Sequence, residues 1–353
     1  MGAGRLRRPA GRSGRPNRMT GPAALPRRGL ALLALALAVV ALCALSVAVG
    51  TRSVPWSEIL GALSGRTDTI GEAAVAARLP RTALALLAGA ALGMAGALLQ
   101  GITRNPLADP GILGINMGAA LAVVVGVAWF SMTSALAYIG AAVLGAGLTA
   151  VFVQVIGSLG RGGATPLKLA LAGAATSVAF SSLVIAVVLP RNDIAGGIQS
   201  WQIGGVGGAT FARILPVLPM LAAGLAIGLI WARRLNALAL GDELAAGLGE
   251  NVLRTRMVAG LAAVLLAGAA TAVCGPIGFV GLVVPHLCRL LVGTDHRWLL
   301  PFSALAGAAL LLVSDVAGRI VARPGELDVG IVTAFVGAPF FIWIVRRQRL
   351  REL

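Results

Sequence analysis

Long apolar segments separated by short polar ones make up most of this 353-residue sequence. A helix needs roughly 20 mainly apolar residues to cross a bilayer. The stretches of about that length or longer without Asp, Glu, Lys or Arg include 110–160, 169–190, 214–232 and 257–288. The pattern therefore predicts an all-α polytopic membrane protein.

Within this pattern, ten apolar segments predict ten transmembrane helices. The eighth segment is short and flanked by Gly and Pro, which favours a broken or tilted helix. A further helix that does not span is expected within 194–208. The ten segments are 29–50, 82–103, 110–129, 134–157, 168–189, 213–232, 257–275, 278–292, 299–314 and 329–345.

The charges indicate how the chain lies in the membrane. Only 12% of residues are charged and 58% are hydrophobic, which excludes an ordinary soluble protein. Eight arginines lie in the first 28 residues beside Gly, Pro and Ser, so 1–28 is predicted to be a disordered cytoplasmic tail rather than an arm that binds nucleic acid. Ten crossings of the 29–347 domain return the basic tail at 348–353 to the same side. We therefore expect a cell-membrane protein with both termini cytoplasmic.

A polar stretch, RNPLADPGILGINMGA at 104–119, separates the second and third predicted helices. Pro106 disfavours helical geometry at Asn105 and so ends the second helix. Asp109 followed by Pro110 is typical of a helix start. The stretch is interpreted as a cytoplasmic turn, with Arg104 at the lipid headgroups.

Seven arginines fall in predicted outer loops, where the charge rule does not favour them. Asp315 stands four residues before one of them, Arg319, which predicts an ion pair within one helix. The seven are Arg52, Arg66, Arg78, Arg81, Arg191, Arg319 and Arg323.

Residues that could carry chemistry are few. Lys168 is the only lysine and does not follow Gly, so the chain has no Walker A loop and we expect ATP to be bound by another chain. His286 and His296 are too few for a metal cluster. We expect no cofactor, no metal and no enzymatic activity of the chain itself. Cys43, Cys274 and Cys288 all lie in apolar surroundings, where cysteine serves as a small packing residue.

The predicted helix centres carry no ionisable residue, which disfavours a proton-coupled carrier. A sodium site built from carbonyls and hydroxyls would escape this test. The predicted inner loop at 236–256 contains a short helical pattern that begins with Asp242 and Glu243. It is interpreted either as a solvated loop helix or as a docking element for a cytoplasmic partner.

Four stretches together resemble one family, the permease subunits of ATP-binding-cassette importers for iron siderophores, haem and vitamin B12. They are RLPRTALALLAGAALGMAGALLQGITRNPLADPGILGINMGA at 78–119, LALGDELAAGLG at 238–249, GPIGFVGLVVPHLCRLLVGTDHRWLLP at 275–301 and ELDVGIVTAFVGAPFFIW at 326–343. The resemblance implies the type II importer permease fold and spans nearly everything after the basic tail.

The resemblance also implies partners within the lipid bilayer and on both sides of it. These are a second permease subunit, in a homodimer or a heterodimer of permeases, two ATPase subunits, and an extracytoplasmic substrate-binding protein. A ferric siderophore is the expected cargo, with cobalamin and haem as alternatives. A secondary carrier that works without ATP is the rival from another class of protein.

Three sets of site residues follow from the resemblance. The docking residues for the binding protein are Arg78, Arg81 and Arg319. The residues that couple to the ATPase are Leu238, Gly241, Asp242, Glu243, Leu248 and Gly249. The translocation path and inner gate are formed by Thr165, Thr176, Ser177, Ser181 and Ser182, although packing explains these small residues equally well.

Overall fold

The computed structural model describes residues 24–159 and 165–349, and every regular element within these ranges is a helix. Each of the ten predicted segments corresponds to a helix or a helical run. By length and composition, 7 of these can cross a membrane, and the others are shorter apolar helices. The ten are α1 (Ala24–Ala48), α3 (Ile70–Thr103), α4 (Ile115–Phe130), α5 (Ala135–Ser158), α6 (Pro166–Val188), α8–η1–α9 (Phe211–Ile214, Leu215–Val217 and Leu218–Leu238), α11 (Val252–Cys274), α12 (Val280–Val292), α13 (His296–Val321) and α14 (Val329–Arg349).

The predicted tails fall largely outside this part of the chain. Residues 1–23, 160–164 and 350–353 are outside the described ranges. The helix α1 begins at Ala24, so the last five residues of the predicted tail at 1–28 belong to this helix.

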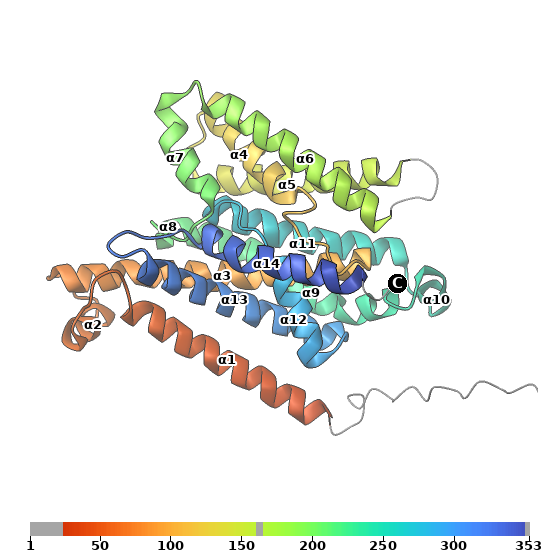
Figure 1. Cartoon of the computed structure of the whole chain (residues 1–353), viewed down its shortest axis with the longest axis horizontal. Helices are drawn as coiled ribbons and strands as arrows, with labels where there is room; N and C mark the ends of the chain where they lie inside the picture. The colour runs from red at the N-terminus through yellow and green to blue at the C-terminus, as the bar shows by residue number, and fades with distance from the viewer. Residues whose placement is uncertain (1–23, 160–164, 350–353) are drawn as a thin grey trace, which may run out of the picture.

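Three short helices mark the two ends of the bundle (Figure 1). We call one end the α2 end, after α2 (Trp56–Leu63), and the other the α10 end, after α10 (Asp242–Gly247). The helix α7 (Asn192–Ile203) confirms the expected short helix near 194–208. Likewise, α10 confirms the short helical pattern predicted inside 236–256.

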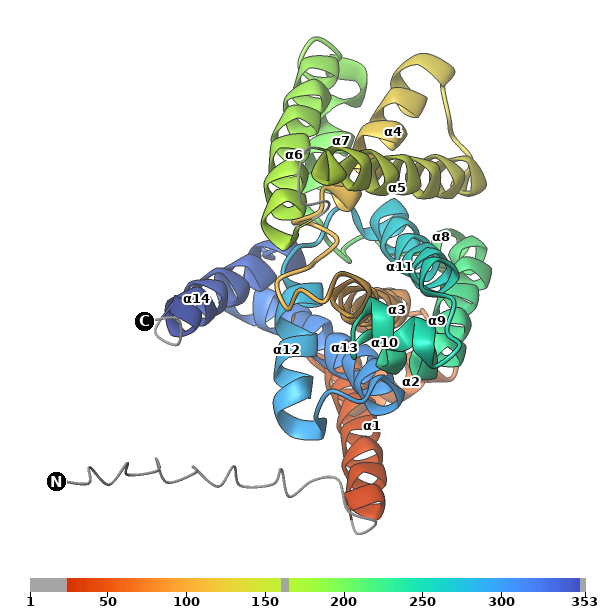
Figure 2. The same cartoon turned by 90° about the vertical axis from the view of Figure 1, so that its right-hand side faces the viewer.

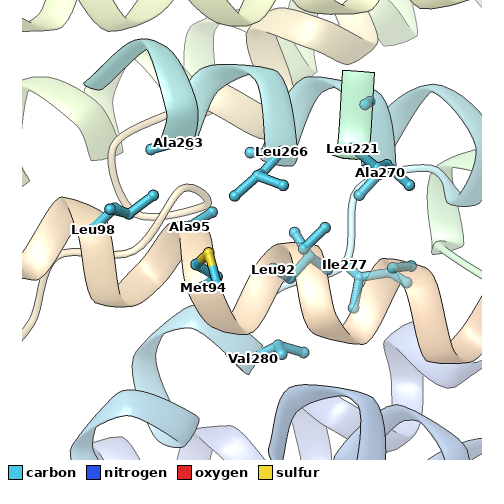
Figure 3. Packing of buried hydrophobic residues seen from close by; sticks show 14 of the residues in the cluster. Leu92, Met94, Ala95, Leu98, Leu221, Ala263, Leu266, Ala270, Ile277 and Val280 are labelled. Atoms are coloured by element: carbon cyan, nitrogen blue, oxygen red, sulfur yellow. The ribbon is translucent and has the colours of Figure 1, made fainter. Parts of the chain in front are cut away.

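The helix α3 lies among α9, α11, α12 and α13 when the bundle is viewed from the α10 end (Figure 2). In its core, Leu92, Ala95 and Leu98 of α3 face Ala263 and Leu266 of α11 (Figure 3), and all five are buried. Lipid tails are as apolar as these side chains, so close packing rather than transfer from water holds such helices together.

Small residues allow this close packing. Gly89 and Gly93 of α3 meet Gly307 and Ser303 of α13, and a Cβ atom at Gly89 would collide with the Gly307 carbonyl. In the sequence these positions form a GxxxG pattern at 89–93 and a run of small residues within 304–308. The structure shows that these two faces pack against each other.

The start of α3 corrects the sequence-based boundary, because the helix begins at Ile70 and not at residue 82. A capping box fixes this start. The Thr69 hydroxyl accepts from the Glu72 backbone N–H at 3.1 Å, and the Glu72 carboxylate accepts from the Thr69 N–H at 3.2 Å. The apolar pattern missed these twelve residues because arginines and Pro80 interrupt it, although Pro80 lies inside the helix.

Candidate functional site

Residues 104–114 form a re-entrant segment rather than the simple turn expected between α3 and α4. Asp109 does start a turn, since its Oδ1 accepts from the N–H groups of Gly111 at 2.8 Å and Ile112 at 3.3 Å. Gly114, at φ +75°, ends this single turn, and α4 begins only at Ile115. The predicted helix start at Pro110 is therefore wrong, because a left-handed glycine interrupts the helix after one turn.

The re-entrant segment enters the interior of the bundle. Asp109 is only 3% exposed and lies against Gly281 of α12. On its other side, the Ser177 hydroxyl of α6 donates to the Gly111 carbonyl at 3.3 Å, and Ile112 packs against Gly173. At about 1.5 Å rise per residue, Gly173 lies about 10 Å inside α6. The segment therefore extends well into the interior of the bundle.

The hydroxyl residues predicted to line a path are spread along α6. Thr165 is the N-cap of this helix and accepts from the Lys168 N–H at 3.3 Å. Thr176 is buried and donates to the Ala172 carbonyl of its own helix at 2.7 Å. Ser181 is half-buried and Ser182 is exposed. The structure thus joins Ser177 to the re-entrant segment and leaves the last two serines nearer the surface of the chain.

The short helix α10 presents an apolar surface at the opposite end from α2. Leu240, Leu244 and Leu248 are 57%, 62% and 69% exposed. Leu244 lies on α10, Leu240 precedes the helix and Leu248 ends it, so we call these three exposed leucines the α10 ridge. Ala245 is fully buried and anchors the helix on its other side.

The residues predicted to couple to a partner divide by exposure. Leu238 is fully buried at the end of α9. Gly241 and Gly249 flank α10 with φ of +112° and +83°, values that glycine adopts without strain. Asp242 and Glu243 are exposed in the first turn of α10. Leu248 of the ridge is exposed at the other end of this helix.

Asp242 is held by arginines from two other helices. Its Oδ1 accepts from Arg256 of α11 at 3.0 Å and forms an ion pair with Arg104 at the end of α3. The structure pairs Arg104, which the sequence predicts to lie at the lipid headgroups, with Asp242. Sequence reasoning missed this cluster because its three residues are far apart along the chain.

A second ionic cluster lies at the α2 end and is buried. Arg319 is 2% exposed and Asp315 is fully buried, and Arg319 Nη2 donates to Asp315 Oδ2 at 2.7 Å. This confirms the predicted pair. Arg319 Nη1 also donates to the carbonyls of Ser46 at 3.0 Å and Val49 at 2.8 Å.

Arg78 also donates hydrogen bonds to backbone carbonyls at the C-terminal end of α1. Its Nη1 donates to the carbonyls of Val47 and Ala48 at 3.0 Å, and its Nη2 donates to the Arg52 carbonyl at 3.0 Å. The last carbonyls of a helix lack partners within the helix. Arg78 and Arg319 therefore bind the C-terminal end of α1 to α3 and α13.

Arg81 bridges two acidic groups. Its Nε donates to Asp315 Oδ1 at 2.8 Å, and its Nη1 pairs with Glu326. The side chain of Arg81 is 12% exposed. All three arginines predicted to dock a binding protein thus have their partners inside the chain.

Comparison with known proteins decides between a transporter subunit and other membrane proteins. The sequence matches the FecCD transport family over residues 37–347, which is nearly the whole described chain. The chain belongs to the FecCD transport family. Members of this family are permeases of ABC importers, which work with ATPase and binding-protein partners, and they are not enzymes.

Curated relatives of this FecCD permease have closely similar lengths. The ferric enterobactin transport system permease protein FepD of Escherichia coli is 45% identical over 302 residues, which cover 85% of this chain and 90% of that protein. The iron(3+)-hydroxamate import system permease protein FhuB of Bacillus subtilis is also 45% identical, over 77% of this chain and 71% of that protein. The hemin transport system permease protein HmuU of Yersinia pestis is 40% identical, over 77% and 82% of the two chains.

A solved structure supports the fold of this FecCD permease. A metal-chelate type ABC transporter in an inward-facing conformation superimposes with a TM-score of 0.76 at 29% identity. The similarity covers 90% of this chain and 99% of that one. The fold is therefore that of an ABC importer permease, as the resemblance implied.

Proposed function

We propose that this FecCD permease is the membrane-spanning subunit of an ATP-driven importer for a ferric siderophore. The family match over residues 37–347 carries the proposal. The relatives FepD and FhuB, each 45% identical, are named for ferric enterobactin and for iron(3+)-hydroxamate. The relative named for hemin is less similar, at 40% identity, so haem is the second candidate cargo.

In the proposed importer two copies of the chain form a homodimer with the cargo path between them. Both termini and α10 face the cytoplasm, and α2 faces outward. The basic residues at the two termini support this orientation, since positive charge favours the cytoplasmic side. The inner gate near Thr165 would then lie at the cytoplasmic end of α6, with Thr176, Ser177, Ser181 and Ser182 further along the path.

The α10 ridge is the proposed docking surface for an ATPase subunit. A motor outside the membrane needs a firm contact through which to transmit motion. The ridge offers exposed Leu240, Leu244 and Leu248 beside Glu243, while Ala245 fixes the helix to the permease. Two copies of the chain would present two ridges, one to each ATPase subunit.

The α2 end is the proposed docking surface for the extracytoplasmic binding protein. Arg78 and Arg319 are buried, so their role there would be to fix the shape of this surface. Direct contact would fall to Arg81 at its edge and to the exposed Arg52 and Arg323. Acidic groups on the binding protein would be steered towards these charges, with a rate that falls as salt rises.

The test is import by purified components in proteoliposomes. The permease is reconstituted with its ATPase subunit and binding protein, and uptake of radioactive ferric siderophore, haem and cobalamin is measured with ATP present or replaced by ADP. We expect ATP-dependent uptake of the siderophore. Uptake of haem or cobalamin alone would reassign the cargo. Uptake driven by an ion gradient without the ATPase would establish the rival carrier instead.

A further inference from the structure

We infer that Arg104 is a positioning residue that links ATPase-driven motion of α10 to the re-entrant segment and so to the cargo path. This rests on the proposed function. The starting observation is the ion pair between Arg104 and Asp242 at the first turn of α10. Arg104 is also the first residue of the re-entrant segment, so the same residue belongs to the ion pair with α10 and to this segment.

The three charged groups of this cluster come from three elements. Asp242 belongs to α10, Arg104 ends α3, and Arg256 lies on the first turns of α11. Their side chains are 47%, 36% and 40% exposed. Because the pairs are half-exposed, they can be broken and remade, unlike the buried pair at the α2 end.

The backbone of Arg104 adopts a left-handed conformation where α3 ends. It has φ 50° and ψ 30°, in the left-handed region that residues other than glycine rarely adopt. Such conformations persist where neighbouring contacts impose them, and they gather at sites that switch. The contact with Asp242 is the side-chain interaction that the structure gives Arg104.

From Arg104 the connection to α6 is short. Six residues separate it from Gly111, whose carbonyl accepts from Ser177. Between them, the Asp109 side chain accepts hydrogen bonds from the backbone N–H groups of Gly111 and Ile112, so this part of the segment has a fixed shape. A shift of α10 that pulls Arg104 would therefore move the backbone that holds Ser177.

The remaining contacts of the segment show where such a shift would act. Ile112 and Leu113 pack against Gly173 of α6, and Asp109 packs against Gly281 of α12. A Cβ at either glycine would collide with the segment, so the fit is close on both sides. Interfaces packed this closely move between discrete arrangements rather than deforming smoothly.

The experiment measures coupling in the reconstituted importer, as siderophore imported per ATP hydrolysed. Arg104→Gly removes the side chain and suits the left-handed backbone, so the fold is preserved. We expect this variant to assemble with the ATPase and to hydrolyse ATP, while import per ATP falls at least about fivefold, the lower range for coupling between sites. Arg104→Lys, which keeps the charge, should recover most of the ratio.

Arg254→Ala is the matched control. Arg254 lies at the same end of α11, is exposed, and has no side-chain ion pair in the described part of the chain. Its import per ATP should equal that of the unmodified protein. Asp242 also pairs with Arg256, so the double-mutant cycle is run in an Arg256→Ala background. There Asp242→Asn should add little to Arg104→Gly, because both changes break the same remaining ion pair.

The outcomes separate this inference from the proposed function. No ATP-driven import by the unmodified complex would contradict the proposed function itself. Normal import by the unmodified complex and by Arg104→Gly at the same ratio would overturn only the inference. Equal losses in Arg104→Gly and Arg104→Lys, or additive losses with Asp242→Asn, would also overturn it, because the charge would then not be what matters.

Discussion

The two ends of this FecCD permease use the same kinds of charged residue in opposite ways. At the α2 end Arg319 and Asp315 are almost completely buried, and Arg78 binds the carbonyls that end α1. At the α10 end Asp242 and its two arginines are half-exposed beside a row of exposed leucines. The buried cluster at the α2 end holds helices of the permease together, whereas the exposed cluster at the α10 end is accessible to a partner.

The energies of the two clusters differ accordingly. Removing one member of a buried ion pair leaves an unpaired charge and costs about 3–5 kcal/mol. An exposed pair contributes only about 0–1 kcal/mol. Substitutions at the α2 end should therefore affect folding, and those at the α10 end should affect interactions with partners.

Arg319→Met should have the largest effect. It leaves Asp315 buried beside Arg81 alone and removes the donors to Ser46 and Val49, so the free energy of unfolding should fall by about 3–5 kcal/mol. Thermal unfolding of the purified permease in detergent measures this. The double variant Asp315→Asn with Arg319→Met should recover part of the loss. An unchanged unfolding temperature in Arg319→Met would show that the buried cluster does not stabilise the fold.

Leu244→Asp should have an intermediate effect, on binding alone. Leu244 is 62% exposed, so its replacement should leave the unfolding temperature unchanged. Loss of a central apolar contact should weaken ATPase binding by about 2 kcal/mol, roughly 30-fold in Kd. The control is Leu63→Asp on α2, also exposed but at the other end. Equal ATPase affinity in both variants would contradict docking on the α10 ridge.

Asp295 should show the smallest effect, as a pH dependence of stability. Burial raises its pKa, but hydrogen bonds from Arg297 and Asn236 outweigh burial and hold the pKa at about 2. A depressed carboxylate pKa stabilises the fold above the unfolded value of about 3.9, and this contribution is lost as pH falls through the folded value.

Because Asp295 is partly exposed, its stabilisation should stay below about 1 kcal/mol. Thermal unfolding of Asp295→Asn and the unmodified protein should differ by a constant small amount from pH 7 to pH 5. The difference should shrink as the pH approaches 3. A difference that grows as the pH falls would have the wrong sign for this carboxylate.

The long apolar helices were predictable from the sequence because each is a local apolar pattern, whereas α2 and the first twelve residues of α3 were not predicted. The pair of Asp315 and Arg319 was predictable for the same reason, since the two residues lie one turn apart. The re-entrant segment was not predictable, because its burial depends on Ser177 and Gly281, which are far away in the chain.

The outer arginines show the same limit. Their charge and their predicted side of the membrane were visible in the sequence, and the family resemblance implied an external partner for three of them. The sequence did not reveal that the carbonyls at the end of α1, which lack hydrogen-bond partners within the helix, would lie beside Arg78 and Arg319. Contacts of this kind depend on how whole helices pack.

Hydrogen exchange of the reconstituted permease, with and without its ATPase subunit, tests the central claim most directly. The claim is that the ATPase subunit binds at the α10 end, while the structure of the α2 end stays unchanged. We predict that the ATPase slows exchange of backbone amides at 238–249 and within 104–114, and leaves exchange at 46–82 and 315–328 unchanged. Protection confined to the α2 end, or none at 238–249, would contradict the account.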